Sequence, residues 1–308
     1  MTSRADLFDA VVELPDASVR RRYNALVGLD DLKARLAKEA ELLLNPAGLE
    51  HWSKTYHGAR IVACDAFADR PPVFLFAGDV GTGKTALAES FGDPVARSLS
   101  IPLLLFRLSL SSRGSGAVGE MTQLLAVAFD EVRRSVGAAS GKHKSASVLL
   151  IDEADALAQS REASQMHHED RAGVNALIRG LNSLSEQHIP VLVVLATNRL
   201  DAIDPAVRRR AAAIFRFERP NEAQRREALV ALLRGVDLCD ADIARLVEAT
   251  GPTDGRTYGF TYSGIYQRLV PSAVLAAYPG RALSRDLLLG TALTITPTPP
   301  FAERHAES

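Results

Sequence analysis

Hydrophobic residues form four short, nearly continuous runs along the chain, at residues 72–77, 103–110, 148–151 and 191–196. Such runs are typical of strands that are buried on both faces of a parallel sheet. The segments that flank them have helical character, at residues 29–44, 84–91 and 120–136. Strands that alternate with helices predict an α/β fold with a parallel sheet.

The pattern divides the chain into four parts. Residues 1–23 are a short, charged lead-in, and residues 24–220 hold the predicted strands and helices of the core. Asn221 can cap a new helix, so we expect residues 221–293 to form a smaller helical lid. Residues 294–308 are rich in proline and are expected to be a flexible tail.

Two local features of the core carry their own predictions. An aromatic patch is expected to pack in the core, with a place near a bound nucleotide as the alternative; it consists of His51, Trp52, Tyr56 and His57. The helix that starts at Lys84 is expected to end near Pro94, because proline disfavours the helical conformation of the residue before it.

Residues 78–85 read Gly-Asp-Val-Gly-Thr-Gly-Lys-Thr and match the phosphate-loop pattern G-x-x-x-x-G-K-[ST] in full. A predicted strand delivers this loop and a predicted helix follows it, which is the context that a phosphate cradle needs. Lys84 can reach the β and γ phosphates, and the Thr85 hydroxyl can ligate Mg²⁺. The enclosing backbone is that of Asp79, Val80, Gly81, Thr82 and Gly83. We therefore expect a nucleoside triphosphate to bind here.

Two carboxylates, Asp152 and Glu153, follow the third apolar run directly. Open α/β sheets bind ligands at the carboxyl ends of their strands, so both groups are expected beside the phosphate loop. Asp152 can then hold Mg²⁺ through water, and Glu153 can orient or deprotonate an attacking water. An acidic first turn of the next helix is the plainer interpretation, and it is compatible with these roles. The expected reaction is hydrolysis.

Polar and basic residues follow the fourth apolar run. Asn198 stands at its end, where a neutral amide can bridge a γ-phosphate and the attacking water. Arg208, Arg209 and Arg210 lie in a predicted short helix further on. Arginines placed there can neutralise transition-state charge on the nucleotide of a neighbouring subunit, and a solvated basic helix face is the alternative.

These parts, in this order, resemble the AAA+ ATPases over about residues 26–271. The segment 27–29 is similar to the part of that family that lies near the adenine, which makes Val27 and Gly28 candidate nucleotide contacts. The resemblance implies a parallel-sheet phosphate-loop core with a C-terminal helical lid. It also implies ATP and Mg²⁺ as cofactors and a homo-hexameric ring.

Within AAA+ the chain resembles a bacterial short form of the pachytene-checkpoint ATPases, which remodel HORMA-domain proteins. Three segments carry this resemblance, Val-Asn-Ala-Leu at 174–177, Asp-x-Ala-x-x-x-Arg-Ala at 204–211, and Ser-Gly at 263–264 with Arg268 and Pro271. The second segment makes Arg210 the candidate arginine finger, with Arg209 as a second candidate. Ile265 stands where the family has a nucleotide-sensing arginine, so Arg268 is the candidate substitute.

Two segments correspond to the axial loops of the family. The first is glycine-rich and spans residues 113–120, where Val118 is the candidate gripping side chain in place of an aromatic residue. A simple flexible turn is the alternative. The second loop holds His167 and His168 beside acidic residues, and we interpret it as a substrate contact, with a metal site as the alternative.

Composition limits the partners. The 308 residues are 47% hydrophobic, which allows a sizeable core, and the net charge of −1 gives no field that would attract DNA or an anionic membrane. Two cysteines are too few for a disulfide scaffold or a zinc site. No apolar run approaches the roughly 20 residues of a membrane span. We expect a cytoplasmic protein with no membrane partner and no obligate nucleic-acid partner.

The resemblance implies ATP-driven opening or disassembly of a HORMA-domain protein complex. In bacteria it implies restraint of a second-messenger anti-phage defence system. A Rubisco-activase-like protein remodeller is an alternative with the same fold, and a DNA-associated loader acting as a nucleotide switch is an alternative of another class. The lead-in is too short for a separate substrate-binding domain, so substrate choice is expected to lie in an adaptor or on the ring face.

Overall fold

The computed structural model describes residues 7–110, 119–138, 145–157, 168–186 and 189–301. The chain forms two compact units. The first unit comprises residues 1–24, 31–77 and 85–216, and the second comprises residues 25–30, 78–84 and 217–308. Residues 78–84 of the predicted phosphate loop and the predicted adenine-proximal segment therefore belong to the second unit, and Thr85 belongs to the first.

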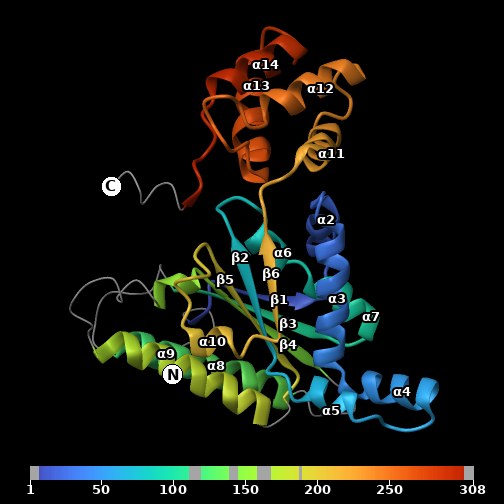
Figure 1. Cartoon of the computed structure of the whole chain (residues 1–308), viewed down its shortest axis with the longest axis vertical. Helices are drawn as coiled ribbons and strands as arrows, with labels where there is room; N and C mark the ends of the chain where they lie inside the picture. Colours follow the sequence, from blue (N-terminus) through green and yellow to red (C-terminus); the bar gives the residue numbers. More distant parts are fainter. Residues whose placement is uncertain (1–6, 111–118, 139–144, 158–167, 187–188, 302–308) are drawn as a thin grey trace. The chain divides into compact units, whose positions relative to one another are not determined.

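The first unit is built on a six-stranded sheet of order β1-β3-β4-β5-β2-β6 (Figure 1). Its strands are β1 (Ala10–Leu14), β2 (Val73–Gly78), β3 (Leu103–Ser109), β4 (Ala146–Asp152), β5 (Val191–Thr197) and β6 (Ala213–Phe217). Strand β3 pairs with β4, β4 with β5, and β5 with β2, all in parallel, whereas β1 joins β3 antiparallel. The predicted α/β fold is confirmed, with a mostly parallel sheet.

Strand β1 lies inside the stretch that the sequence predicted as a lead-in outside the core, and that prediction was wrong. Leu14 pairs with Leu103 at one end of the strand. Just before it, Leu7 and Phe8 are buried, and the Phe8 ring lies 4.9 Å from the Phe106 ring. An edge strand exposes part of its surface, so this short segment lacks the continuous hydrophobicity that marks the inner strands.

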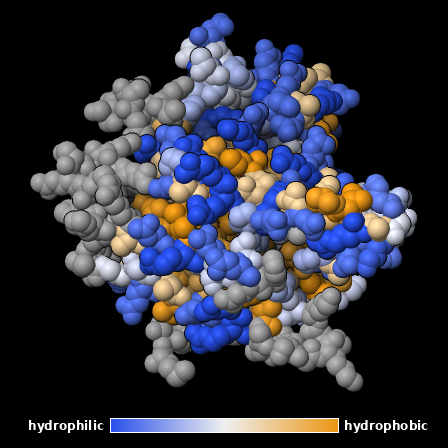
Figure 2. Space-filling view, turned by 60° about the horizontal axis from the view of Figure 1, so that its bottom comes forward, coloured by the Kyte–Doolittle hydropathy of each residue, from blue (hydrophilic) through white to orange (hydrophobic). Residues whose placement is uncertain are grey.

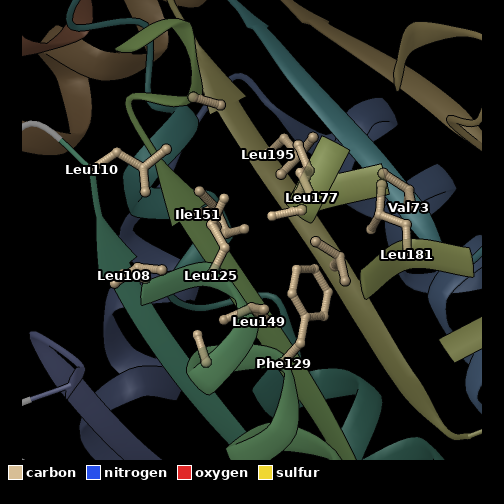
Figure 3. Close-up of a cluster of buried hydrophobic side chains, with 14 of the residues drawn as sticks. Val73, Leu108, Leu110, Leu125, Phe129, Leu149, Ile151, Leu177, Leu181 and Leu195 are labelled. Carbon is tan, nitrogen blue, oxygen red and sulfur yellow. The ribbon is translucent and has the colours of Figure 1, made fainter. Parts of the chain in front are cut away.

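Helices cover both faces of the sheet. On one face, α8 (Glu120–Ala138) and α9 (His168–Glu186) lie side by side (Figure 1). Their apolar residues meet alternate residues of the strands in one buried cluster, part of which Figure 3 shows; it includes Val73, Leu108, Leu125, Phe129, Leu149, Ile151, Leu177, Leu181 and Leu195. Between β1 and β2 the chain forms α2 (Ala17–Ala25), α3 (Asp30–Leu44), α4 (Pro46–His57) and α5 (Ala63–Ala68), and between β2 and β3 it forms α6 (Lys84–Ala88) and α7 (Gly92–Leu99).

The strand residues between these positions point to the other face. Phe76 is fully buried there, and its ring lies 6.3 Å from that of Phe91 and 5.5 Å from that of Phe215. We expect Phe76→Ala to destabilise the first unit by about 3–5 kcal/mol, because the cavity cannot collapse against rigid strands. The thermal midpoint should fall by roughly 6–20 °C.

Circular dichroism melts measure this effect. Tyr56→Ala is the matched control, because Tyr56 is 74% exposed and its loss should change stability by less than about 0.5 kcal/mol. A Phe76→Ala melt that coincides with that of Tyr56→Ala would contradict the assigned core.

Two other local predictions were also wrong. On α4 (Pro46–His57), Trp52 is 44% exposed and Tyr56 is 74% exposed, so the aromatic patch does not pack in the core. The two rings contact each other at 6.3 Å between centroids. The helix after the phosphate loop ends at Ala88, and Pro94 lies in the first turn of α7. Proline is tolerated there because the first N–H groups of a helix have no intrahelical acceptor.

The second unit contains helical segments within residues 221–294, the part of the chain for which the sequence predicted a lid. Its helical segments are α11 (Glu222–Leu232), α12 (Asp240–Ala249), a π-helical segment (Gly264–Leu269), α13 (Val270–Ala277) and α14 (Arg285–Thr294). They share a core that includes Leu229, Leu246, Phe260 and Leu288. Asn221 caps α11, as the sequence predicted, and the structure adds a capping box with Gln224.

The sequence predicted a flexible tail for residues 294–308, and the described chain end covers residues 294–301 of it. It is held by hydrogen bonds as far as Phe301. Among the described residues, no helix combines the length and the apolar character that crossing a bilayer requires, and no cluster of three or more His, Cys, Asp or Glu side chains is placed to hold a metal ion. Figure 2 shows one face of the molecule, on which hydrophobic residues form separate groups among polar ones.

Candidate active site

In the first unit, an oxygen pair lies where β4 ends and α6 begins. The Thr85 hydroxyl donates to Asp152 Oδ1 over 3.4 Å. Asp152 is the last residue of β4, and Thr85 is the second residue of α6. A hydroxyl and a carboxylate at this separation provide the oxygen ligands that Mg²⁺ prefers, so the two residues predicted from the sequence fit this ion.

A cation on the neighbouring strand accompanies this pair. Arg107 Nη2 lies 3.7 Å from Asp152 Oδ2, and its Nη1 forms an ion pair with Glu89. The guanidinium offsets part of the negative charge that the carboxylates bring to this edge of the sheet. We did not predict this role, although a charged residue inside the apolar run 103–110 was a signal for it.

Glu153 follows β4 with an unusual backbone conformation. Its φ of 55° lies in the left-handed region, which costs an ordinary residue roughly 1–2 kcal/mol. The Ser109 hydroxyl at the end of β3 donates to Glu153 Oε2 over 3.1 Å. Strain of this kind often marks a functional group that must leave the direction of its strand.

We expect Ser109→Ala to lower kcat for ATP hydrolysis by about 2- to 10-fold, the effect of one lost hydrogen bond on the position of the Glu153 carboxylate. KM for ATP should not change, because Ser109 is not a predicted nucleotide contact. Steady-state kinetics test this. Ser109→Thr keeps the hydroxyl and serves as the control, and equal kcat values for the two variants would contradict the role.

Asp155 organises the neighbouring strand end. It lies in the 3₁₀ turn Ala154–Leu157, and it is only 8% exposed. Its Oδ1 accepts from the Thr197 hydroxyl at 3.0 Å and from the backbone N–H of Asn198 at 3.4 Å. The backbone of Asn198 is therefore tied to the turn that follows the Asp152–Glu153 pair. The sequence assigned no role to Asp155 or Thr197, because only the pairing of β4 with β5 brings them together.

The three arginines differ in their surroundings. They follow or end α10 (Pro205–Arg208), whose N-cap is Asp204. Arg210 is held within its own chain, since Nε donates to Asn182 Oδ1 at 3.1 Å and Nη1 donates to the carbonyl of Ala206 at 3.0 Å. Arg209 is exposed. The guanidinium of Arg210 thus has a defined orientation at the surface.

In the second unit, the phosphate loop surrounds the ammonium of Lys84. Lys84 Nζ donates to the carbonyl oxygens of Gly78 at 2.9 Å and of Asp79 at 2.7 Å. The Thr82 hydroxyl also donates to the Asp79 carbonyl, at 2.7 Å. Phosphate oxygens can replace these carbonyls as acceptors, so the loop fits its predicted ligand.

Glycine is required in this loop at position 81. Gly81 has φ of 77°, and a Cβ atom there would lie 2.7 Å from Thr261 Oγ1 and 2.8 Å from Ser263 Cβ. The Gly81 carbonyl also accepts from the Ser263 N–H at 3.0 Å. Within this unit, therefore, the phosphate loop packs directly against the residues that begin the π-helical segment.

The predicted adenine-proximal segment is tied to the helices of the same unit. The Gly28 carbonyl, next to Val27, accepts from Gln224 Nε2 at 2.6 Å and from the Tyr262 hydroxyl at 3.4 Å. Burial raises the pKa of Tyr262 to about 12, so the hydroxyl keeps its proton and remains a donor at neutral pH. Gln224 had no predicted role, yet it serves both the cap of α11 and this carbonyl.

The structure distinguishes the two candidate lid residues. Ile265 is fully buried in the core of the second unit, so its position cannot present a side chain to a ligand. Arg268 is exposed, and its Nη1 donates to Thr298 Oγ1 at 3.4 Å. The predicted axial-loop residues Val118 and His167 lie outside the described residues, and His168 is the first residue of α9.

Comparisons with known proteins agree with these features. Residues 74–219 match the model of the ATPase family associated with various cellular activities (AAA). CD-NTase-associated protein 6 of Escherichia coli (strain MS 115-1) is 50% identical over 302 residues, which cover 97% of this chain and 97% of that protein. The chain belongs to the AAA ATPase family. This membership makes ATP its nucleotide and ATP hydrolysis its activity.

Solved structures place this AAA ATPase near one group within the family. A chain in the structure of the E. coli MS115-1 HORMA:CdnC:Trip13 complex matches with a TM-score of 0.90 and 50% identity, over 97% of this chain and 99% of that one. Rhizobiales Trip13 matches with a TM-score of 0.74 and 42% identity, over 95% of this chain and 100% of that one. The family resemblance drawn from the motifs is confirmed.

Proposed function

We propose that this AAA ATPase uses ATP hydrolysis to open or disassemble a HORMA-domain protein complex, and that it thereby restrains a bacterial anti-phage defence system. One observation carries the proposal. A chain that is 50% identical along nearly its whole length, with a TM-score of 0.90, forms a complex with HORMA and CdnC. Similarity over 97% of the chain favours a shared partner over a shared ATPase core alone.

The chemistry follows from the geometry at the carboxyl ends of the strands. Thr85 and Asp152 would hold Mg²⁺, which would offset charge on the phosphates. Glu153, held by Ser109, would orient the attacking water and take its proton. Asn198, positioned through Asp155, would align the same water.

The ring and the finger belong to the same proposal. We expect six copies, in which Arg210, with Arg209 beside it, would approach the nucleotide of the adjacent copy. The hydrogen bonds of Arg210 to Asn182 and Ala206 support this, because they hold the guanidinium ready at the surface. Analytical ultracentrifugation with ATP, using the slowly hydrolysing Glu153→Gln variant, would measure the stoichiometry.

Reconstitution tests the remodelling reaction. A HORMA protein encoded near the gene for this chain would be bound to its closing partner, and the complex followed by size-exclusion chromatography. ATP and the wild-type protein should separate the complex, and Lys84→Ala should leave it intact. A complex that stays whole while ATP is hydrolysed would overturn the proposal.

The same preparation separates the alternatives. A DNA-associated loader should hydrolyse ATP faster when DNA is added, whereas a remodeller should respond to its folded protein substrate. The grip of Val118 on substrate, the cytoplasmic location and the lack of an obligate nucleic-acid partner stay predictions.

A further inference from the structure

The phosphate loop of this chain contains an acidic residue, Asp79, and both of its carboxylate oxygens accept hydrogen bonds. Asp79 Oδ1 accepts from the N–H of Val80 at 2.8 Å and from the N–H of Phe301 at 3.2 Å. Asp79 Oδ2 accepts from Arg219 Nε at 2.9 Å and from Arg219 Nη2. Only 15% of the Asp79 side chain is exposed, so these bonds are largely shielded from water.

Arg219 joins three parts of the second unit at this point. Besides Asp79, its Nη1 donates to the carbonyl of Gly259 at 2.8 Å and its Nη2 donates to the carbonyl of Thr298 at 2.8 Å. The guanidinium also lies 5.0 Å from the centre of the Tyr258 ring, and the Arg219 side chain is 16% exposed. An arginine whose planar fork meets this many acceptors is fixed in place.

The chain end meets the phosphate loop mainly through its backbone. We call residues 298–301 the C-terminal strap. The carbonyl of Thr298 accepts from Arg219, and the N–H of Phe301 donates to Asp79, so both ends of the strap are attached. Thr298 Oγ1 also accepts from Arg268 Nη1 at 3.4 Å.

The strap therefore acts on the residue that also holds Lys84. The carbonyl of Asp79 accepts from Lys84 Nζ at 2.7 Å and from the Thr82 hydroxyl at 2.7 Å. A rotation of the Asp79 peptide would move the oxygen on which the ammonium rests. In addition, a carboxylate in a phosphate loop repels a triphosphate, and Arg219 offsets that repulsion only while the two side chains stay paired.

We propose that the C-terminal strap positions the phosphate loop, with Asp79 and Arg219 as the positioning residues, and that it slows the release of nucleotide. The inference rests on the ATPase activity of the chain and goes beyond it. The strap keeps Asp79 paired with Arg219 and keeps the loop in one conformation. Loss of the strap lets the loop open and the nucleotide leave sooner.

Dissociation of a fluorescent ADP analogue, N-methylanthraniloyl-ADP, followed by stopped flow on the full-length chain, tests this. Phe301→Pro removes the N–H that donates a hydrogen bond to Asp79. Phe301→Ala keeps that N–H and shows how much the loss of the aromatic ring alone changes the release rate. Relative to Phe301→Ala, we expect Phe301→Pro to release nucleotide about 3- to 10-fold faster, as the loss of one hydrogen bond of ordinary strength predicts. KM for ATP should rise, whereas kcat should stay within about threefold of its value in Phe301→Ala. The reason is that no residue that touches the reacting atoms has changed.

A double-mutant cycle with Asp79→Ala isolates the link. In that background the Phe301 N–H has no Asp79 carboxylate to bond, so Phe301→Pro and Phe301→Ala should release the analogue at the same rate. If Phe301→Pro and Phe301→Ala released the analogue at equal rates with Asp79 present, the proposed role of the strap would be contradicted. It would also be contradicted if their release rates differed by the same factor with Asp79 and with Asp79→Ala. Wild-type protein that fails to bind the analogue would overturn the ATPase assignment as well, and Lys84→Ala provides the non-binding reference for that outcome.

Discussion

Glu153→Gln is expected to lower kcat for ATP hydrolysis by about 10²- to 10⁴-fold while nucleotide binding is preserved. The carboxamide has nearly the same shape as the carboxylate, and it can still accept from Ser109 through its oxygen. It cannot take a proton from the attacking water. KM, or the dissociation constant for fluorescent ATP, should therefore stay within about threefold.

A coupled ATPase assay and a nucleotide-binding titration measure the two quantities. Glu186→Gln is a matched control, because it makes the same chemical change at an exposed position at the end of α9. If Glu153→Gln hydrolysed ATP at the rate of Glu186→Gln, Glu153 would not be the base. The same variant should also retain its protein substrate, and mass spectrometry of proteins that co-purify with ATP present would identify it.

Arg210→Ala should lower kcat by about 10³-fold or more, within the range expected when an arginine finger is removed. Nucleotide binding should be spared, because the phosphate loop of the same chain is unchanged. Arg209→Ala should have a smaller effect, since Arg209 lacks the two hydrogen bonds that orient Arg210. Asn182→Ala should lower kcat only in part, because it loosens the guanidinium without removing it.

Mixing experiments decide whether the finger acts between subunits. Lys84→Ala subunits cannot bind ATP but still supply Arg210, and Arg210→Ala subunits bind ATP but lack the finger. Mixed assemblies should recover part of the activity that neither variant has alone. Arg216→Ala, at an exposed position on β6, is the control for loss of a positive charge. Wild-type hydrolysis by Arg210→Ala, or no recovery on mixing, would remove the shared-site assignment.

Local sequence was sufficient to predict a residue's position where that position is the end of an inner strand. Thr85 and Asp152 were predicted as a pair although they lie 67 positions apart, and the structure brings their oxygens to 3.4 Å. Continuous apolar runs mark buried strands, and parallel strands place their carboxyl ends at one edge. The N-cap of α11 at Asn221 was predictable for a similar reason, because a cap involves only a few adjacent residues.

Prediction failed where exposure or pairing depends on distant residues. Trp52 and Tyr56 looked like core residues by type, but α4 presents them to solvent. Strand β1 was missed because its edge position leaves its hydrophobic pattern weak. Ser109 gained its role only when β3 was placed beside β4, which no local pattern specifies.

The sequence by itself determined the chemistry and the fold class of this protein. The phosphate loop, the two carboxylates that follow one buried run and the asparagine that follows the next each have a predicted role, which rests on residue type and on position at the strand end. The tertiary structure alone decided which groups support them. Arg219 lies 140 residues from Asp79, and Phe301 lies 222 residues from it, yet both contact its carboxylate. Contacts over such separations depend on how whole helices and strands pack, and local conformational propensity does not determine that packing.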